Sequence, residues 1–174
     1  MEYILAIDQS TSGTKALLFD ESARLIGRSD LPHTQKISEN GWVAHDPMEI
    51  WENTKGVVRA VVEKTGIDRG EIVGIGISNQ RETALVWDRE SGLPVYDAIV
   101  WQCARGAKIC EGLSEYAEMI RERTGLRLSP YFSAAKIAWV LQNAGDLTGK
   151  KLCCGTIDSW LVFKMTGGAE FRCD

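Results

Sequence analysis

The sequence predicts an α/β domain with a mixed sheet flanked by helices. Three apolar strand patterns follow one another at the N-terminus, a capped amphipathic helix begins near residue 47, and further strand and helix patterns follow. The apolar fraction of 44% and the charged fraction of 25% are typical of an ordinary globular protein. A chain of 174 residues is long enough for one sizeable core and short for two.

The three N-terminal strands are expected at residues 3–8, 15–19 and 24–30. Short loops join them, which predicts a β-meander rather than a βαβ unit. A dinucleotide-binding fold would need a helix directly after the first strand.

The first helix has a strong start signal, with Asp46 as N-cap, Pro47 at the first helical position and Glu49 three residues after the cap. Residues 65–66 (TG) are expected to end it. One helical face carries Ile50, Thr54, Val57, Val58, Val61 and Val62.

The rest of the chain alternates between strand and helix patterns. Residues 72–78 (IVGIGIS) are expected to form a buried strand, 83–88 another strand, and 95–101 an extended segment. Residues 104–124 are expected to be mostly helical. Ser133 is expected to cap a helix to about residue 143, followed by a strand at 151–155 and a helix at 158–166 that ends at Gly167 and Gly168. Residues 169–174 look like the opening of another strand, so the chain is expected to stop inside a domain.

Composition argues against several classes of protein. The net charge of −4, without a basic run, argues against a nucleic-acid partner. No segment approaches the roughly 20 apolar residues of a membrane span, and no signal peptide is expected because the N-terminus lacks a positive region. The two histidines make a His-based metal cluster unexpected. The odd number of cysteines without CxxC spacing favours reduced thiols in a cytoplasmic protein over disulfides or zinc; they are Cys103, Cys110, Cys153, Cys154 and Cys173.

The loop at residues 8–15 is a candidate phosphate-binding site. The hydroxyls and the backbone amides of this loop, made flexible by Gly13, can donate to phosphate oxygens, and Lys15 adds a positive charge. The hydroxyls are those of Ser10, Thr11, Ser12 and Thr14. Asp8, at the end of the preceding strand, can hold Mg²⁺ through water. The alternative is a plain hairpin loop, since Ser, Thr and Gly are common turn residues. No GxxxxGK[ST] motif occurs.

Arg81 and Glu82 are candidates for binding a small polyol. Arg offers only hydrogen-bond donors and an ionised Glu only acceptors, whereas a hydroxyl is both, so the pair can fix the direction of each hydroxyl. The alternative is a surface ion pair on a turn, which is common and weak.

Two aromatic residues are further candidates. The Trp101 indole can form an apolar wall against a small ligand, and the Tyr131 phenol adds a hydroxyl. Core packing is the alternative for both. It is the interpretation adopted for the five remaining tryptophans, Trp42, Trp51, Trp87, Trp139 and Trp160.

Together these motifs resemble one family. Residues 7–15 (IDQSTSGTK) resemble the N-terminal phosphate loop of the FGGY carbohydrate kinases. Four later stretches resemble the glycerol kinases of that family: residues 41–51 (GWVAHDPMEIW), 76–83 (GISNQRET), 98–103 (AIVWQC) and 155–161 (GTIDSWL). The resemblance covers nearly the whole chain in the family's order.

The resemblance implies a ribonuclease-H-like, actin-type ATPase fold and the transfer of a phosphoryl group from MgATP to a terminal hydroxyl of glycerol. By matching positions, four residues would line the glycerol pocket: Arg81, Glu82, Trp101 and Tyr131. Four residues would face the ATP phosphates: Thr11, Ser12, Gly13 and Lys15. Asp8 would hold the Mg²⁺. Phosphoryl transfer depends on such alignment and charge neutralisation.

The resemblance also implies a truncated domain, with residues 1–174 as part of the N-terminal kinase domain and the C-terminal domain absent. The aspartate that acts as general base would lie beyond Asp174, so no catalytic residue is assigned here and the chain alone is expected to be inactive. The full-length protein is expected to be a cytoplasmic homo-oligomer that binds a small polyol and neither nucleic acid nor membrane.

Other hypotheses remain open. Ser10 and Lys15 stand where glycerol kinases usually have Gly and Arg, and the sequence Ser-Gly-Thr-Lys at residues 12–15 resembles that of xylulose kinases. A kinase for another polyol or sugar is therefore the first alternative, and a non-catalytic actin-like nucleotide-binding domain is the second. A ribonuclease-H-type nuclease would need clustered carboxylates, and only Asp8 is suitably placed.

Overall fold

A computed structural model of the chain describes residues 1–172, which fold into two compact units. The first unit comprises Met1–Gln35 and Asp46–Gln80. The second comprises Lys36–His45 and the chain from Arg81 onward.

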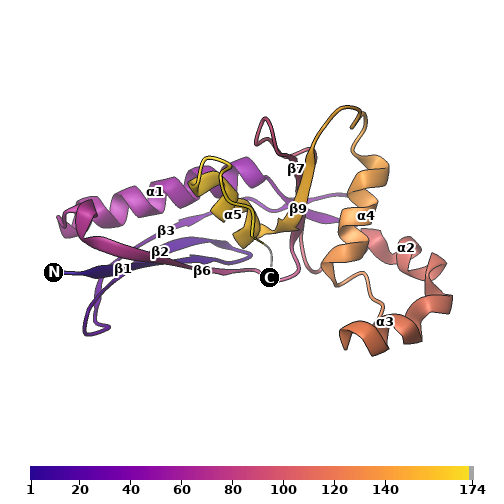
Figure 1. Cartoon of the computed structure of the whole chain (residues 1–174), viewed down its shortest axis with the longest axis horizontal. Coiled ribbons are helices and arrows are strands. Elements are labelled where there is room, and N and C mark those ends of the chain that lie inside the picture. The colour runs from indigo at the N-terminus through magenta and orange to yellow at the C-terminus, as the bar shows by residue number, and fades with distance from the viewer. Residues whose placement is uncertain (173–174) are drawn as a thin grey trace. The chain divides into compact units, whose positions relative to one another are not determined.

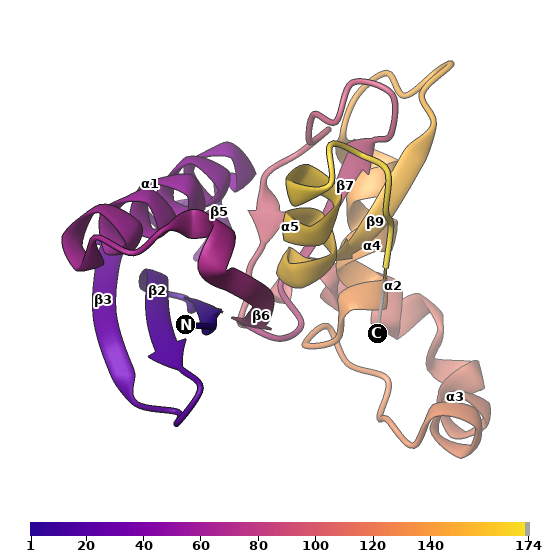
Figure 2. The same ribbon diagram turned by 60° about the vertical axis from the view of Figure 1, so that its left-hand side comes forward.

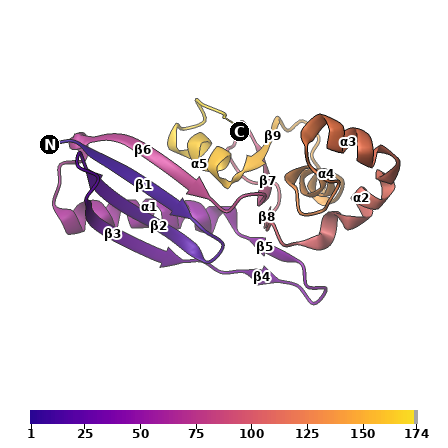
Figure 3. The same ribbon diagram turned by 90° about the horizontal axis from the view of Figure 1, so that it is seen from below.

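The first unit is a mixed sheet covered on one face by a helix. Among the described residues, four strands lie in the order β3-β2-β1-β6, with β1 antiparallel to β2 and parallel to β6. The long helix α1 packs against β2 and β3 (Figure 3). The strands are β1 (Tyr3–Gln9), β2 (Gly13–Asp20), β3 (Leu25–Pro32) and β6 (Ile72–Asn79), and the helices are α1 (Pro47–Thr65) and a short 3₁₀ helix, η1 (Arg69–Glu71). The predicted meander and the mixed sheet are confirmed.

The core of the first unit lies between the sheet and α1. Alternate residues of β1 and β2 point inward and meet the apolar face of the helix, as strand and helix periodicity require. Each Leu or Val side chain fully buried there contributes about 1.5–3 kcal/mol. The buried cluster consists of Tyr3, Leu5, Ala16, Leu18, Val57 and Val61.

Helix α1 begins and ends where the sequence predicts. The Asp46 carboxylate accepts a hydrogen bond of 2.8 Å from the Met48 amide, and Gly66 ends the helix in the left-handed conformation. In a capping box, the Glu49 carboxylate would accept a hydrogen bond from the Asp46 amide. In this structure, Glu49 Oε1 accepts a hydrogen bond of 3.1 Å from the Thr34 amide. The side chain thus links the helix start to the segment after β3.

Removing the Asp46 cap is expected to destabilise the protein. The variant Asp46→Ala should lose about 1 kcal/mol of unfolding free energy, because the Met48 amide loses its side-chain acceptor. Asp46→Asn should keep most of the stability, since Asn caps as well as Asp. Urea denaturation measures both, with Glu63→Ala on the exposed face of α1 as the control. Equal stability of Asp46→Ala and Glu63→Ala would contradict the cap assignment.

The prediction that residues 72–78 form a buried strand is wrong in one respect. The segment is a strand, but Val73 and Ile75 are each 56% exposed. Strand β6 is the edge of this sheet, and α1 packs against β2 and β3. An apolar run predicts a strand but does not show that anything covers it.

The second unit contains a sheet that the sequence did not reveal. Among the described residues, five strands pair antiparallel in the order β4-β5-β8-β7-β9. Strands of two or three residues carry no periodicity, and of the extended segment expected at 95–101 only two residues join the sheet. The strands are β4 (Lys36–Ile37), β5 (Val43–His45), β7 (Ala84–Asp88), β8 (Ala98–Ile99) and β9 (Leu152–Thr156).

Two helices cover opposite faces of the β7–β9 pair, α4 (Ser133–Asn143) and α5 (Ile157–Met165) (Figures 1 and 2). Val86 packs with Val140 of α4. Trp87, the next residue, meets Trp160 of α5 with ring centroids 5.5 Å apart. Both faces of β7 are therefore buried, and the packing roles expected for Trp87 and Trp160 are confirmed.

The helical prediction for residues 104–124 is confirmed, but the helix is broken into short pieces. These are η2 (Ala104–Gly106), α2 (Ala107–Gly112), η3 (Ser114–Tyr116) and α3 (Ala117–Thr124), the last ending at a left-handed Gly125.

Two other sequence predictions are wrong. Ser133 is the first residue of α4 rather than its cap, and no side-chain capping bond forms at Phe132, which occupies the cap position. Residues 169–172 do not form a strand. The last two positions of that predicted strand, Cys173 and Asp174, lie outside the described residues.

Four cysteines of the described chain form no disulfide: Cys103, Cys110, Cys153 and Cys154. Burial raises the pKa of Cys110 and of Cys153 above that of an exposed thiol, which favours their neutral form. No helix within residues 1–172 is long and apolar enough to cross a membrane.

Candidate phosphate and polyol sites

The candidate phosphate loop is the hairpin between β1 and β2. Asp8 and Lys15 are cross-strand partners at its base, and Lys15 Nζ lies 2.7 Å from Asp8 Oδ2. Their side chains are 41% and 29% exposed, so the pair is accessible to a ligand while still formed.

The tip of this hairpin is held by hydrogen bonds within the loop and by a contact with His33. The Ser10 hydroxyl donates to the Gly13 carbonyl at 3.0 Å and lies 3.4 Å from the Ser12 hydroxyl. His33 Nε2 lies 3.0 Å from the Thr11 carbonyl oxygen. Thr11 and Ser12 therefore sit on a loop whose backbone is already ordered.

Gly13 has a packing role that the sequence did not reveal. A Cβ atom at this position would lie 2.6 Å from the Leu31 carbonyl oxygen, closer than real Cβ contacts. Glycine is needed because β2 and β3 approach each other closely here, rather than because the loop must flex.

Asp8 is the candidate Mg²⁺ residue of this loop. In the part of the chain that the structure describes, no group of three or more His, Cys, Asp or Glu side chains could form a metal cage. One carboxylate beside a phosphate loop still fits Mg²⁺, which usually keeps several waters and takes its other ligands from substrate phosphates.

The candidate polyol site is built around the turn before β7. Glu82 adopts a positive φ of 65°, a left-handed conformation that is rare for a residue other than glycine. The Ser133 hydroxyl lies 3.4 Å from both the Glu82 carbonyl oxygen and Glu82 Oε2, and can donate to either. Such backbone strain is frequent at functional sites. The adjacent Arg81 is exposed.

The two aromatic candidates come together beside this turn. The Trp101 amide donates to the Thr83 hydroxyl at 3.2 Å, which places Trp101 next to the Glu82 turn. The Trp101 and Tyr131 rings meet edge to face with centroids 6.0 Å apart. Tyr131 remains 43% exposed, so it is not fully used in core packing.

Sequence reasoning missed two residues of this cluster, Ser133 and Lys136. Ser133 was interpreted as a helix cap, whereas its hydroxyl faces Glu82. Lys136 is completely buried on α4. Its spacing of four residues from Val140 places it on the buried face of the helix, which is the signal that could have identified it.

The comparisons with known proteins agree with these observations. The sequence profile of the FGGY family of carbohydrate kinases, N-terminal domain, matches residues 3–174. The chain belongs to this family. It is 46% identical to a glycerol kinase of Fusobacterium nucleatum, covering 97% of the chain and 35% of the relative. It is 48% identical to glycerol kinase 1 of Thermotoga maritima, covering 99% and 36%. This FGGY chain thus spans about a third of the length of these curated relatives.

Solved structures of FGGY kinases have the same fold. The structure of Plasmodium falciparum glycerol kinase with ADP matches with a TM-score of 0.87 at 36% identity, covering 97% of this chain and 35% of that one. A xylulose kinase from Brucella ovis matches with a TM-score of 0.82 at 26% identity, covering 93% and 34%. The predicted ribonuclease-H-like, actin-type class is confirmed by these matches.

Proposed function

We propose that this chain is the N-terminal portion of an ATP-dependent kinase that converts glycerol to glycerol 3-phosphate. The observation that carries the proposal is the cluster around Glu82, a carboxylate on a strained turn beside an aromatic pair. The four polyol residues of the sequence prediction belong to the second unit of the fold. Glu82, Trp101 and Tyr131 are linked there through the Thr83 hydroxyl and the contact between the two rings.

The cluster has the chemistry that glycerol recognition needs. Glu82 would accept hydrogen bonds from two hydroxyls, Arg81 would donate to a hydroxyl oxygen, and Trp101 and Tyr131 would cover the carbon chain. Holding one terminal hydroxyl in a fixed direction aligns it for in-line transfer and removes the entropy cost of that alignment from the reaction step.

On the nucleotide side, the β1–β2 hairpin would hold the ATP phosphates. The Thr11 and Ser12 hydroxyls and the hairpin amides would donate to phosphate oxygens, Gly13 would let β2 lie close to β3, and Lys15 would add positive charge. Asp8 would hold Mg²⁺ through water, and the ion would neutralise charge on the transferred phosphoryl group.

Other features of the full-length protein are part of the same proposal. The general base is assigned to a segment outside this chain, so the chain alone is proposed to bind substrate weakly and not to turn it over. We further propose a cytoplasmic homo-oligomer with a small-molecule substrate and no nucleic-acid or membrane partner, in line with the net charge of −4.

A pentulose kinase is the second candidate, and two observations favour it. Ser10 and Lys15 depart from the usual glycerol kinase loop, and the structural matches include a xylulose kinase. These two residues lie on the phosphate hairpin, whereas the sugar-facing cluster matches the glycerol kinases.

A coupled ADP-release assay on the full-length protein tests the proposal. We expect kcat/KM for glycerol to exceed that for xylulose by at least about tenfold, and the 174-residue chain alone to release no ADP. A higher kcat/KM for xylulose would favour the pentulose alternative. Absence of turnover with either substrate would favour the non-catalytic actin-like alternative.

A further inference from the structure

A buried lysine contacts the backbone of Tyr131, an aromatic residue of the candidate polyol site. Lys136 is 0% exposed, and its ammonium donates to the backbone carbonyls of Tyr131 and, at 3.3 Å, Phe132. Both carbonyls precede the first turn of α4. The Lys136 side chain therefore ties the segment that carries Tyr131 to the body of the helix.

This arrangement is costly for the fold. The hydrogen-bond acceptors of Lys136 are neutral carbonyl oxygens, and burial of a charge without a directly paired opposite charge is unfavourable. Burial lowers the pKa of Lys136 to about 8, so the amine is mostly protonated at pH 7 and loses its proton in mildly alkaline solution. A methionine could fill similar space without this penalty. The charge therefore calls for an explanation in terms of its surroundings.

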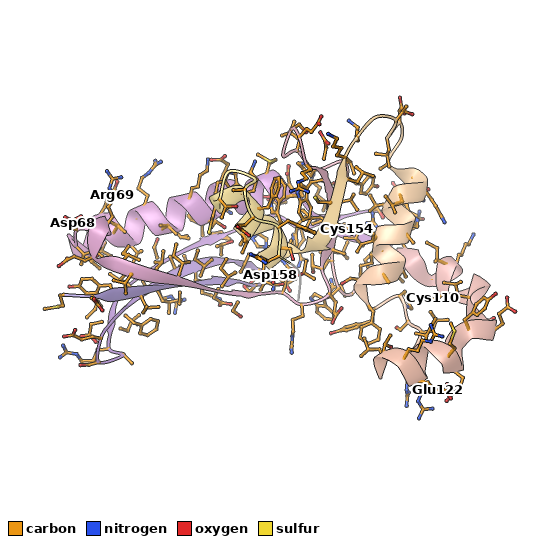
Figure 4. The ribbon with its side chains drawn as sticks, in the orientation of Figure 1. Asp68, Arg69, Cys110, Glu122, Cys154 and Asp158 are labelled. Atoms are coloured by element: carbon orange, nitrogen blue, oxygen red, sulfur yellow. The ribbon has the colours of Figure 1, made fainter. Side chains whose placement is uncertain are left out.

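The charged surroundings of Lys136 point to Glu82. Three ionisable groups can act on the charge of Lys136, the Glu82 carboxylate and the thiols of Cys103 and Cys110, and a negative charge on any of them favours the protonated amine. Cys110, labelled on α2 in Figure 4, is a buried thiol with a raised pKa. Of these three groups, Glu82 is the only carboxylate, whereas the other two are thiols. The Lys136 ammonium also lies 5.9 Å from the centroid of the Tyr131 ring, within range of a cation–π contact.

We propose that Lys136 is a positioning residue of the polyol site. Its ammonium fixes the Tyr131 backbone and adds positive charge to the surroundings of Glu82, so that the aromatic wall and the carboxylate are held in place before substrate arrives. The Lys136 side chain is buried and its hydrogen bonds go to backbone carbonyls. Lys136 therefore acts through Tyr131 and Glu82 rather than on the substrate directly. The inference rests on the proposed function of this cluster.

The variant Lys136→Met tests the proposal in the full-length kinase, with Lys108→Met as the matched control. Lys108 is an exposed lysine on α2 of the same unit. We expect Lys136→Met to raise the KM for glycerol about tenfold or more and to change the KM for ATP less than about twofold. Lys108→Met should change neither. A glycerol KM close to that of the wild type in a folded Lys136→Met protein would overturn the proposal.

The pH profile separates positioning by charge from simple packing. In the wild type, the glycerol KM should rise as pH increases through about 8, because the Lys136 amine loses its proton there. Lys136→Met should start at the high KM and lack this rise, while Lys108→Met should keep it. The same alkaline rise in Lys136→Met would show that another group causes it and would overturn the charge-based role.

A measurement without substrate keeps the test independent of the proposed function. NMR of the wild type should show nuclear Overhauser contacts between the Trp101 and Tyr131 rings, whose centroids are 6.0 Å apart, and Lys136→Met should weaken them. Unchanged contacts would overturn the positioning role even if glycerol is not the substrate. Conversely, if the wild type does not use glycerol and Lys136→Met weakens these ring contacts, only the substrate assignment is overturned.

Discussion

Replacing Glu82 with glutamine is expected to reduce kcat/KM for glycerol by about 10²-fold in the full-length kinase. The change removes a charged acceptor that would bind substrate hydroxyls, and hydrogen bonds to charged groups contribute about 1.5–3 kcal/mol each. The variant Glu82→Gln would keep the size of the side chain and an acceptor oxygen for the Ser133 hydroxyl. Steady-state kinetics with glycerol and with ATP measure the effect, and the KM for ATP should change little.

The backbone of Glu82 gives this prediction a second, opposite readout. Glu82 holds a left-handed φ of 65°, which costs a residue with a Cβ about 1–2 kcal/mol, whereas glycine adopts it freely. Glu82→Gly should therefore remove glycerol use and still match or exceed the wild-type stability, by up to about 1 kcal/mol after the entropy cost of glycine.

Ala23 provides the matched control for this readout. Within residues 1–172, Ala23 and Glu82 are the two residues other than glycine that have a positive φ. The φ of Ala23 is 58°, in the turn between β2 and β3. Ala23→Gly should gain similar stability and leave glycerol kinetics unchanged. If Glu82→Gly kept normal glycerol kinetics, Arg81 and Glu82 would be the surface ion pair on a turn that the local sequence pattern by itself favours.

The parts of the fold that sequence predicted are those with long periodic segments. The β1–β3 meander and α1, with Asp46 and Gly66 at its ends, each contain a repeated pattern or a defined cap. The second sheet was missed because β4, β5 and β8 have only two or three residues each. Strands this short are defined by their pairing partners, which sequence alone does not show.

The residues of the candidate polyol site also differ in how far sequence could predict them. Arg81, Glu82, Trp101 and Tyr131 could be named because their residue types suit a polyol and because the motifs resemble one family. The role of Ser133 depends on a tertiary contact with Glu82, and that of Lys136 on burial and a contact with the Tyr131 backbone five residues earlier. A serine at a helix start has a strong local explanation as a cap, so the local signal pointed to the wrong role.

The exposed face of β6 shows a further limit of sequence reasoning. Val73 and Ile75 have the composition of a buried strand, and they are more than half exposed on the edge of the sheet. Composition reports what a segment prefers to contact, while exposure depends on whether a partner element is present.

Replacing Lys15 with methionine is expected to reduce kcat/KM for ATP by about 10- to 100-fold, with a smaller change in the KM for glycerol. Loss of a charge-assisted contact to phosphate accounts for an effect of this size. The same change should have little effect on stability, because the Lys15–Asp8 pair is partly exposed and such pairs contribute about 0–1 kcal/mol. A functional loss without a stability loss is what a phosphate-binding residue predicts and a plain hairpin residue does not.

Two further variants make the Lys15 prediction specific. Lys15→Arg keeps the charge and should retain most of the activity with ATP, although its planar group contacts phosphate differently. Arg28→Met removes another exposed ion pair of the same sheet, the contact of 2.8 Å with Asp30 on β3, and should leave ATP kinetics unchanged. If Lys15→Met and Arg28→Met had the same KM for ATP, the hairpin would be a structural turn. In that case the nucleotide phosphates would have to be held by another part of the protein.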